Sequence, residues 1–252
     1  MKRLLIWLWP PALFLSLLIL LFEFLVQSQR IPSFLVPAPS EVWAAAVENK
    51  NELLVALLGT FWATVQGLFI GFVLGQLLAL LLSVFDFARR ALMPIAVFFQ
   101  TVPIIAIAPL LVIWFGFGMP TVRASAAIVC FFPILSNALV GLESGRREFL
   151  ELFEVLHARR WQTLFYLQIP SSFRTNMAGL RVAAGLAVVG AIVGEFVGGG
   201  GLGALIDVAR TQQRVDLVFA CVILSSILGL ILVGICSLIE SLLRKWRPLD
   251  QV

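Results

Sequence analysis

Charged and reactive side chains are scarce in this sequence of 252 residues. Only 13% of them are Asp, Glu, Lys or Arg, whereas a soluble globular domain carries about 25%. The chain has one histidine, His157, and three cysteines, which lie in apolar runs and lack the spacing of metal ligands. It also lacks the glycine-rich loop with a lysine that cradles nucleotide phosphates. These absences argue against a soluble domain, and we expect no catalytic residue, metal site or bound cofactor, so that the chain by itself is not an enzyme.

Long apolar runs take the place of the missing charges. Hydrophobic residues make up 61% of the chain, and its mean hydropathy is +1.03. About 20 apolar helical residues cross a hydrocarbon core of about 30 Å. Six runs reach that length, namely 4–26, 57–85, 92–115, 121–141, 176–197 and 216–243. They are continuous rather than alternating, which disfavours a β-barrel, and the first has no cleavage site of a signal peptide. We therefore predict an all-α polytopic helical membrane protein, a single transmembrane domain over 1–252 with six transmembrane helices.

The basic residues predict how these spans are oriented, because Lys and Arg accumulate in cytoplasmic loops near the ends of spans. With the N-terminus inside, thirteen of the 18 basic residues are cytoplasmic and five are external. The external ones are Arg30, Lys50, Arg123, Arg210 and Arg214. We expect both termini in the cytoplasm. The net charge of +4 then reports topology, and no nucleic-acid partner is needed to explain it.

Prolines and polar residues in the run 92–115 mark candidate positions along a path through the membrane. Pro103 stands close to Gln100 and Thr101 in this run. A proline inside a span frees backbone carbonyls, and irregular backbone persists in a bilayer only within protein or beside water. We expect these three residues to face an interior path. The alternative is a bent helix that only packs.

A carboxylate and a glycine-rich segment close the fifth run. Glu195 stands near the external end of 176–197 and is followed by Phe-Val-Gly-Gly-Gly-Gly-Leu-Gly, which includes Gly199. Ionisable residues within spans are candidates for function. We expect Glu195 and Gly199 to belong to the path or its gate. The alternative is that Glu195 reaches water or accepts hydrogen bonds from the glycine loop.

The longest polar segment, 142–174, separates the fourth and fifth runs and predicts a docking surface in the cytoplasm. Residues 146–157 carry apolar residues at helical spacing. A second short helix should cover 160–168 and end at Pro170. The expected structure is a helix, a sharp turn and a helix. The alternative is an amphipathic loop that rests on lipid headgroups.

The second half of this segment, 151–170, resembles the EAA loop of permeases from binding-protein-dependent ABC importers. That motif runs Glu-Ala-Ala, three residues, Gly-Ala, and a helix that closes in Leu-Pro. Its positions are occupied here by Glu151, Ala158, the aromatic Trp161 and the pair Ile169-Pro170. Residues 100–116 and 194–203 are similar to segments of the nitrate, sulfonate, taurine and thiamine-precursor branch. The resemblance covers the chain from residue 37 onward.

This resemblance implies a type I ABC importer permease in a bacterial inner membrane. Its five-helix core would be 57–243, with a cytoplasmic coupling segment at 146–169. The residues expected to couple to the ATPase are Glu151, Leu152, Phe153, Leu156, His157, Ala158, Arg159, Trp161 and Pro170. The implied partners are cytoplasmic ABC ATPase subunits that hydrolyse ATP, an extracytoplasmic solute-binding protein, a second copy of this chain and the lipid bilayer.

The coupling segment departs from the family pattern at three positions. The family usually has Gly where this sequence has His157, and Ala-Ala where it has Leu152 and Phe153. Glycine there permits a left-handed turn, and histidine is among the residues that tolerate this conformation best. We expect the turn to persist and the socket on the partner to be adjusted to the larger side chains.

The resemblance identifies the class of transporter more specifically than it identifies the substrate. It favours a thiamine-pyrimidine precursor or similar heterocycle, followed by a sulfonate or taurine, and then nitrate. An alternative from another class is a secondary transporter driven by an ion gradient, which should carry charged residues near the middle of its spans. Such residues are scarce here. A structural scaffold is a third alternative, against which the proline-broken spans and the glycine hinge argue.

Overall fold

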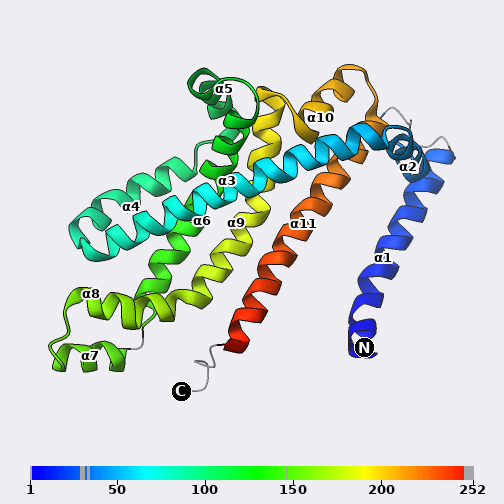
Figure 1. Cartoon of the computed structure of the whole chain (residues 1–252). Helices are drawn as coiled ribbons and strands as arrows, with labels where there is room; N and C mark the ends of the chain where they lie inside the picture. The colour runs from blue at the N-terminus through cyan, green and yellow to red at the C-terminus, as the bar shows by residue number, and fades with distance from the viewer. Residues whose placement is uncertain (1, 29–31, 33–34, 146, 247–252) are drawn as a thin grey trace.

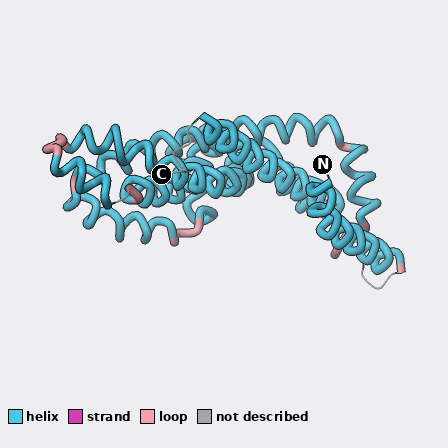
Figure 2. The backbone as a smooth tube through the Cα atoms, turned by 90° about the horizontal axis from the view of Figure 1, so that it is seen from below, coloured by secondary structure: helices cyan, strands magenta, loops and turns pink. Residues whose placement is uncertain are grey.

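The computed structural model describes residues 2–28, 32, 35–145 and 147–246. Arg30, Arg247 and Arg146, the first residue of the predicted coupling segment, lie outside this part of the chain. The described residues form helices and no strand, and Figure 2 shows helix along nearly the whole trace. In chain order the helices are α1 (Lys2–Gln27), α2 (Pro39–Glu48), α3 (Lys50–Val84), α4 (Asp86–Gln100), α5 (Ile104–Phe115), α6 (Met119–Glu143), α7 (Arg147–Val155), α8 (Arg160–Thr163), the π-helical turn η1 (Leu164–Gln168), α9 (Ile169–Gly198), α10 (Gly201–Thr211) and α11 (Val215–Trp246). The all-α prediction is confirmed.

Four of the described helices are long and apolar enough to cross a membrane. They cover 50–84, 119–143, 160–198 and 215–243. Three of them contain a predicted run whole, and 50–84 contains all of 57–85 except its last residue. The first predicted run corresponds to α1, of which 13–27 is a shorter apolar helix. The chain is therefore a polytopic helical membrane protein, as predicted.

The run 92–115 does not form one continuous helix, which corrects the sequence prediction. It is divided into α4 and α5 by a break at residues 101–103. Pro103 has an extended backbone, with φ −61° and ψ 124°, and it precedes the first residue of α5. The Thr101 hydroxyl donates to the Phe98 carbonyl at 2.7 Å and satisfies one of the last acceptors of α4. Proline thus ends this helix rather than bending it.

The helices run between two ends of the molecule (Figure 1). The start of α1, the end of α11 and the α7–α8 segment lie at the lower end in that view, whereas α2, α5 and α10 lie at the upper end. The first described turn of α1 and the last turn of α11 therefore share an end with the predicted coupling segment. The count of basic residues predicts that these three parts lie on the same side of the membrane, and the structure places them at the same end. Which side that end faces stays a prediction.

Glycines bring α3 and α6 into close contact. Gly67, Gly71 and Gly75 are spaced by four residues, so they lie on one face of α3. A Cβ atom on Gly71 would lie 2.5 Å from Cys130 Sγ and 2.8 Å from the Ala127 carbonyl oxygen. Only a residue without a side chain allows the backbones to approach so closely.

Small residues on α9 form a second close interface, with α6. Ala183, Ala187 and Ala191 are fully buried on α9 and pack in clusters with residues of α6. The Ser125 hydroxyl of α6 donates to the Gly190 carbonyl at 2.7 Å. These contacts make α3, α6 and α9 the centre of the bundle.

The outer helices are joined to this centre by fewer contacts. Arg181 of α9 forms an ion pair with Glu240 of α11, with Nη1 and Oε2 2.8 Å apart. Helix α1 stands beside the bundle (Figure 1) and is tied to α2, because Ser40 donates its N–H and hydroxyl to Glu23 at 3.0 and 2.6 Å. Helix α1 therefore lies outside the bundle that is centred on α3, α6 and α9.

Candidate functional site

The predicted coupling segment forms a helix, a turn and a helix. Helix α7 ends in a pair of hydrogen bonds, from Ala158 N to the Phe153 carbonyl and from His157 N to the Glu154 carbonyl, each 2.9 Å long. This pattern is a Schellman cap, which requires a left-handed residue just beyond the helix. His157 occupies that position with φ +51°. The prediction that histidine can replace glycine in this turn is confirmed.

Apolar side chains of this segment are exposed at the surface of the chain. The exposed fractions are 48% for Leu152, 67% for Leu156 and 51% for Trp161. Phe153 and Ala158 are half-buried, whereas Glu151, His157 and Arg159 are exposed. An apolar surface rimmed by charged groups is typical of a site that binds another protein. The segment therefore has the surface that docking demands, although docking itself stays a prediction.

The segment is fixed to the membrane helices at its second half. Leu164 is 9% exposed and packs in a cluster with Leu82 of α3 and Leu139 of α6. Arg160 of α8 donates from Nη1 to the Val84 carbonyl at the end of α3, at 2.7 Å. A force on α8 would therefore reach the ends of α3 and α6 directly.

The expected end of the second short helix at Pro170 is wrong. Helix continues from Arg160 to Gly198 over 39 residues, and Pro170 lies half-buried in the first turn of α9. The chain makes room for the proline with the π-helical turn η1, in which Ile169 N donates to the Leu164 carbonyl five residues earlier. The wider turn relieves the clash between the proline ring and the carbonyl four residues before it. The second helix of the coupling segment, α8, and α9 are consequently one continuous rod.

Three of the predicted path residues lie together at the break between α4 and α5. Gln100, Thr101 and Pro103 line a cavity of about 340 Å³, which is closed by residues of α6 and by Leu186 of α9. Each of the three is exposed in the isolated chain. The break thus opens a hollow beside the central helices, and irregular backbone in a bilayer needs such a setting.

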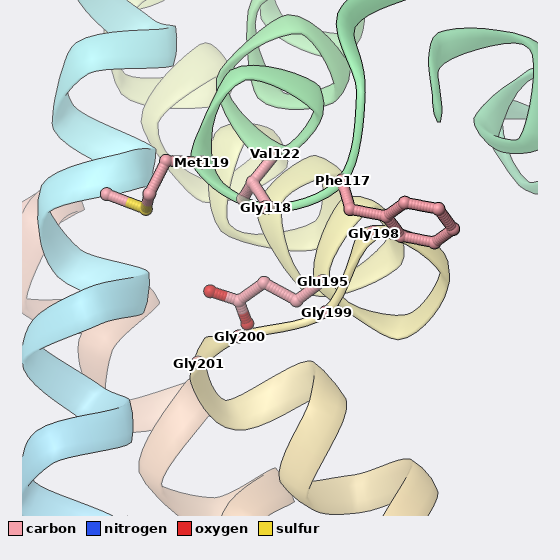
Figure 3. Close-up of a pocket in the computed structure, with 9 residues that line it drawn as sticks. All are labelled: Phe117, Gly118, Met119, Val122, Glu195, Gly198, Gly199, Gly200 and Gly201. Carbon is pink, nitrogen blue, oxygen red and sulfur yellow. The ribbon is translucent and has the colours of Figure 1, made fainter. Parts of the chain in front are cut away.

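The other two path residues, Glu195 and Gly199, line a separate cavity of about 370 Å³ at the upper end (Figure 3). Its walls are Phe117, Met119 and Val122 together with the glycines of 198–201. The two cavities share no lining residue, so the structure does not bring the five predicted residues into one site.

The Glu195 side chain is buried, with 2% of its surface exposed. Its Oε2 atom accepts hydrogen bonds from Gly203 N at 2.8 Å and from the Thr60 hydroxyl at 3.0 Å. Of the alternatives open from the sequence, a hydrogen bond to the glycine loop is present. Figure 3 shows the carboxylate pointing toward that loop.

Sequence reasoning missed Thr60, which meets Glu195 from α3. Thr60 is fully buried, and it stands in an apolar run where nothing marks it. The glycine spacing of Gly67, Gly71 and Gly75 was also missed, although the repeat of four residues is a readable signal of close helix packing.

Comparison with known proteins decides the family. Residues 67–245 match the family described as the binding-protein-dependent transport system inner membrane component. The chain belongs to this family. The protein is therefore a permease subunit of the ABC importers that work with a solute-binding protein, and it is a multi-pass membrane protein.

Relatives of this permease match it over nearly their full length. It is 34% identical to the formylaminopyrimidine transport permease of Halalkalibacterium halodurans, over 94% of this chain and 95% of that one. It is 33% identical to the riboflavin transport system permease of Chloroflexus aurantiacus, over 95% and 91% of the two chains. A Bacillus subtilis permease provisionally named for aliphatic sulfonates transport is 27% identical, over 95% and 88%.

Proposed function

We propose that this permease forms the translocation path of an ATP-driven importer for a small nitrogen heterocycle of the aminopyrimidine class. The observation that carries the proposal is the exposed helix–turn–helix of α7 and α8 in a chain whose family works with a separate energy source. The substrate class rests on the relatives named for formylaminopyrimidine and riboflavin, both nitrogen heterocycles, which are more similar to this chain than the relative named for sulfonates.

The proposed mechanism starts at the coupling segment. Two ATPase subunits close on binding ATP and push on the exposed residues of α7 and α8. Because helix is continuous from Arg160 to Gly198, the push passes along a rod roughly 58 Å long, at 1.5 Å for each residue. Alternating access then requires two packings of similar free energy, which the nucleotide state of the ATPase biases.

The orientation and the partners form part of the same proposal. The end that holds both termini and α7–α8 faces the cytoplasm, in keeping with the excess of basic residues there. The opposite end, with α2, α5 and α10, receives the solute-binding protein. A second copy of the chain completes the path, in which Gln100, Thr101 and Pro103 line the middle and Glu195 and Gly199 the outer mouth.

Uptake into proteoliposomes tests this function. Vesicles that contain this permease and its ATPase should accumulate a labelled aminopyrimidine only when ATP and the solute-binding protein are both supplied. Uptake that needs an ion gradient but neither ATP nor the ATPase would instead establish a secondary transporter. Accumulation of a sulfonate but no aminopyrimidine would keep the importer and overturn the proposed substrate.

A further inference from the structure

A closed set of hydrogen bonds joins three helices at the outer cavity. The N–H of Leu202 donates to Thr60 Oγ1 at 2.9 Å. The Thr60 hydroxyl lies 3.0 Å from Glu195 Oε2, and the N–H of Gly203 donates to the same oxygen at 2.8 Å. Thr60 belongs to α3, Glu195 to α9, and the two amides to the first turn of α10.

The side chains of Thr60 and Glu195 act as the N-terminal cap of α10, which has no capping side chain of its own. The first N–H groups of a helix have no partner within the helix, and a side chain just before it usually accepts from them. That position is Gly200, which has no side chain. The acceptors come instead from residues 142 and 8 positions away in the chain, on two other helices.

Gly201 makes room for this arrangement. Its φ is +65°, a left-handed conformation, and a Cβ atom there would collide with the Glu195 carboxylate. The glycine loop therefore passes close beside the carboxylate (Figure 3). A larger residue at position 201 could not coexist with the closed set of hydrogen bonds.

Because these residues are buried, the junction between α10 and the Thr60–Glu195 pair has two stable states, closed and open. Thr60 and Leu202 are fully buried and Glu195 is 2% exposed. If α10 moved away by a small distance, the N–H groups of Leu202 and Gly203 would lose their acceptors and the Glu195 carboxylate would lose one of its two donors while all remained buried, which is unfavourable. The junction is therefore stable only when it is fully closed or opened far enough for water to enter.

We propose that Thr60 and Glu195 form an outer latch, a pair of positioning residues that holds α10 closed over the outer cavity and releases it during transport. Glu195 stands three residues before the end of the rod that begins in α8, so a displacement of the coupling segment reaches the latch through one helix. The latch itself follows from the hydrogen bonds and burial, whereas its release in a transport cycle rests on the proposed function.

Labelling of a cysteine inside the cavity tests the latch without ATP or any partner. Val122 lines the cavity and is 1% exposed. In a chain whose three native cysteines are replaced, the thiol of Val122→Cys reacts with a water-soluble reagent only when water enters the cavity. Thr60→Val keeps the shape of the side chain and removes its hydroxyl. Thr64→Val is the matched control, because Thr64 is equally buried on α3 and donates to the Thr60 carbonyl of its own helix at 2.7 Å.

In right-side-out membrane vesicles, a membrane-impermeant maleimide should label the cysteine at position 122 roughly tenfold faster in Thr60→Val than in Thr64→Val, since the two buried hydrogen bonds that Thr60 makes to Leu202 and Glu195 are lost. Thr60→Ser should restore slow labelling. Equal rates in Thr60→Val and Thr64→Val would overturn the latch. If Thr60→Val does not insert, Glu195→Leu, which removes the acceptor oxygens, provides the same comparison, and slow labelling in that variant would likewise overturn the latch. If the labelling rates are as expected but vesicles with the ATPase, ATP and the solute-binding protein take up no substrate, the latch stands and the proposed function is overturned.

Discussion

Replacement of Gly71 by valine is expected to prevent α3 and α6 from packing and to destabilise the whole bundle. A Cβ atom at this position would lie 2.5 Å from Cys130 Sγ and 2.8 Å from a backbone oxygen of Ala127, and backbone cannot move aside as a side chain can. Forcing extra atoms into a packed interface costs about 1–3 kcal/mol or more. The thermal unfolding midpoint of the detergent-purified protein should fall, and less of the protein should elute as a single species.

Gly234→Val provides the matched control for this prediction. Gly234 lies on α11, and a Cβ atom there would meet no atom within 4 Å. The same change in side chain should therefore leave the unfolding midpoint unchanged. If Gly71→Val were as stable as Gly234→Val, the close approach of α3 and α6 described above would be incorrect.

Tryptophan in place of Ala158 is expected to abolish attachment of the ATPase while the permease remains inserted. Ala158 follows the left-handed His157 in the turn between α7 and α8, where it is half-buried. A small residue there allows a partner to approach the turn closely, and an indole would fill that space. The amount of ATPase that co-purifies with the permease should fall at least roughly tenfold, equivalent to about 1.4 kcal/mol of binding free energy.

Leu230→Trp is the control for the size of the new side chain. Leu230 is 73% exposed on the apolar surface of α11, away from the coupling segment, and its replacement should leave co-purification unchanged. Normal co-purification and uptake with Ala158→Trp would show that the turn does not contact the ATPase.

The membrane spans could be predicted because each is a continuous apolar run. In a bilayer such a run forms a helix, since only a helix satisfies its backbone hydrogen bonds within the segment.

The effect of the prolines on the helices was harder to predict. Pro103 ends a helix that the sequence suggested would only bend, whereas Pro170 lies within a helix that it was expected to end. Proline removes one donor in both places. Whether the helix continues depends on what the neighbouring residues can rearrange, such as the π-helical turn before Pro170.

The outer junction shows a second limit of sequence reasoning. Glu195 could be noticed because a carboxylate is unusual in an apolar run, and the glycines beside it predicted an unusual backbone. Thr60 could not be noticed, since threonine is common in spans and often bonds to its own helix. Its partner Glu195 is 135 residues away in the chain, so the pairing exists only once α3 and α9 have packed.

The continuous helix from Arg160 to Gly198 connects the features that the sequence presented separately. One end, α8, carries Trp161, an exposed residue of the coupling segment, and the other carries Glu195 beside the outer cavity. Since an α-helix is stiff along its axis, the two ends move together more readily than two helices joined by a loop. A break at Pro170, as first expected, would have separated them.

Cross-linking from the coupling segment tests the central claim most directly. A cysteine in place of Leu152, which is 48% exposed on α7, should form a cross-link to the ATPase subunit in membrane vesicles that contain the assembled importer. A cysteine in place of Val47, 52% exposed on α2 at the opposite end, should form none. Cross-linking from residue 47, or its absence from every exposed position of 147–163, would contradict the assignment of this segment as the point where the ATPase attaches.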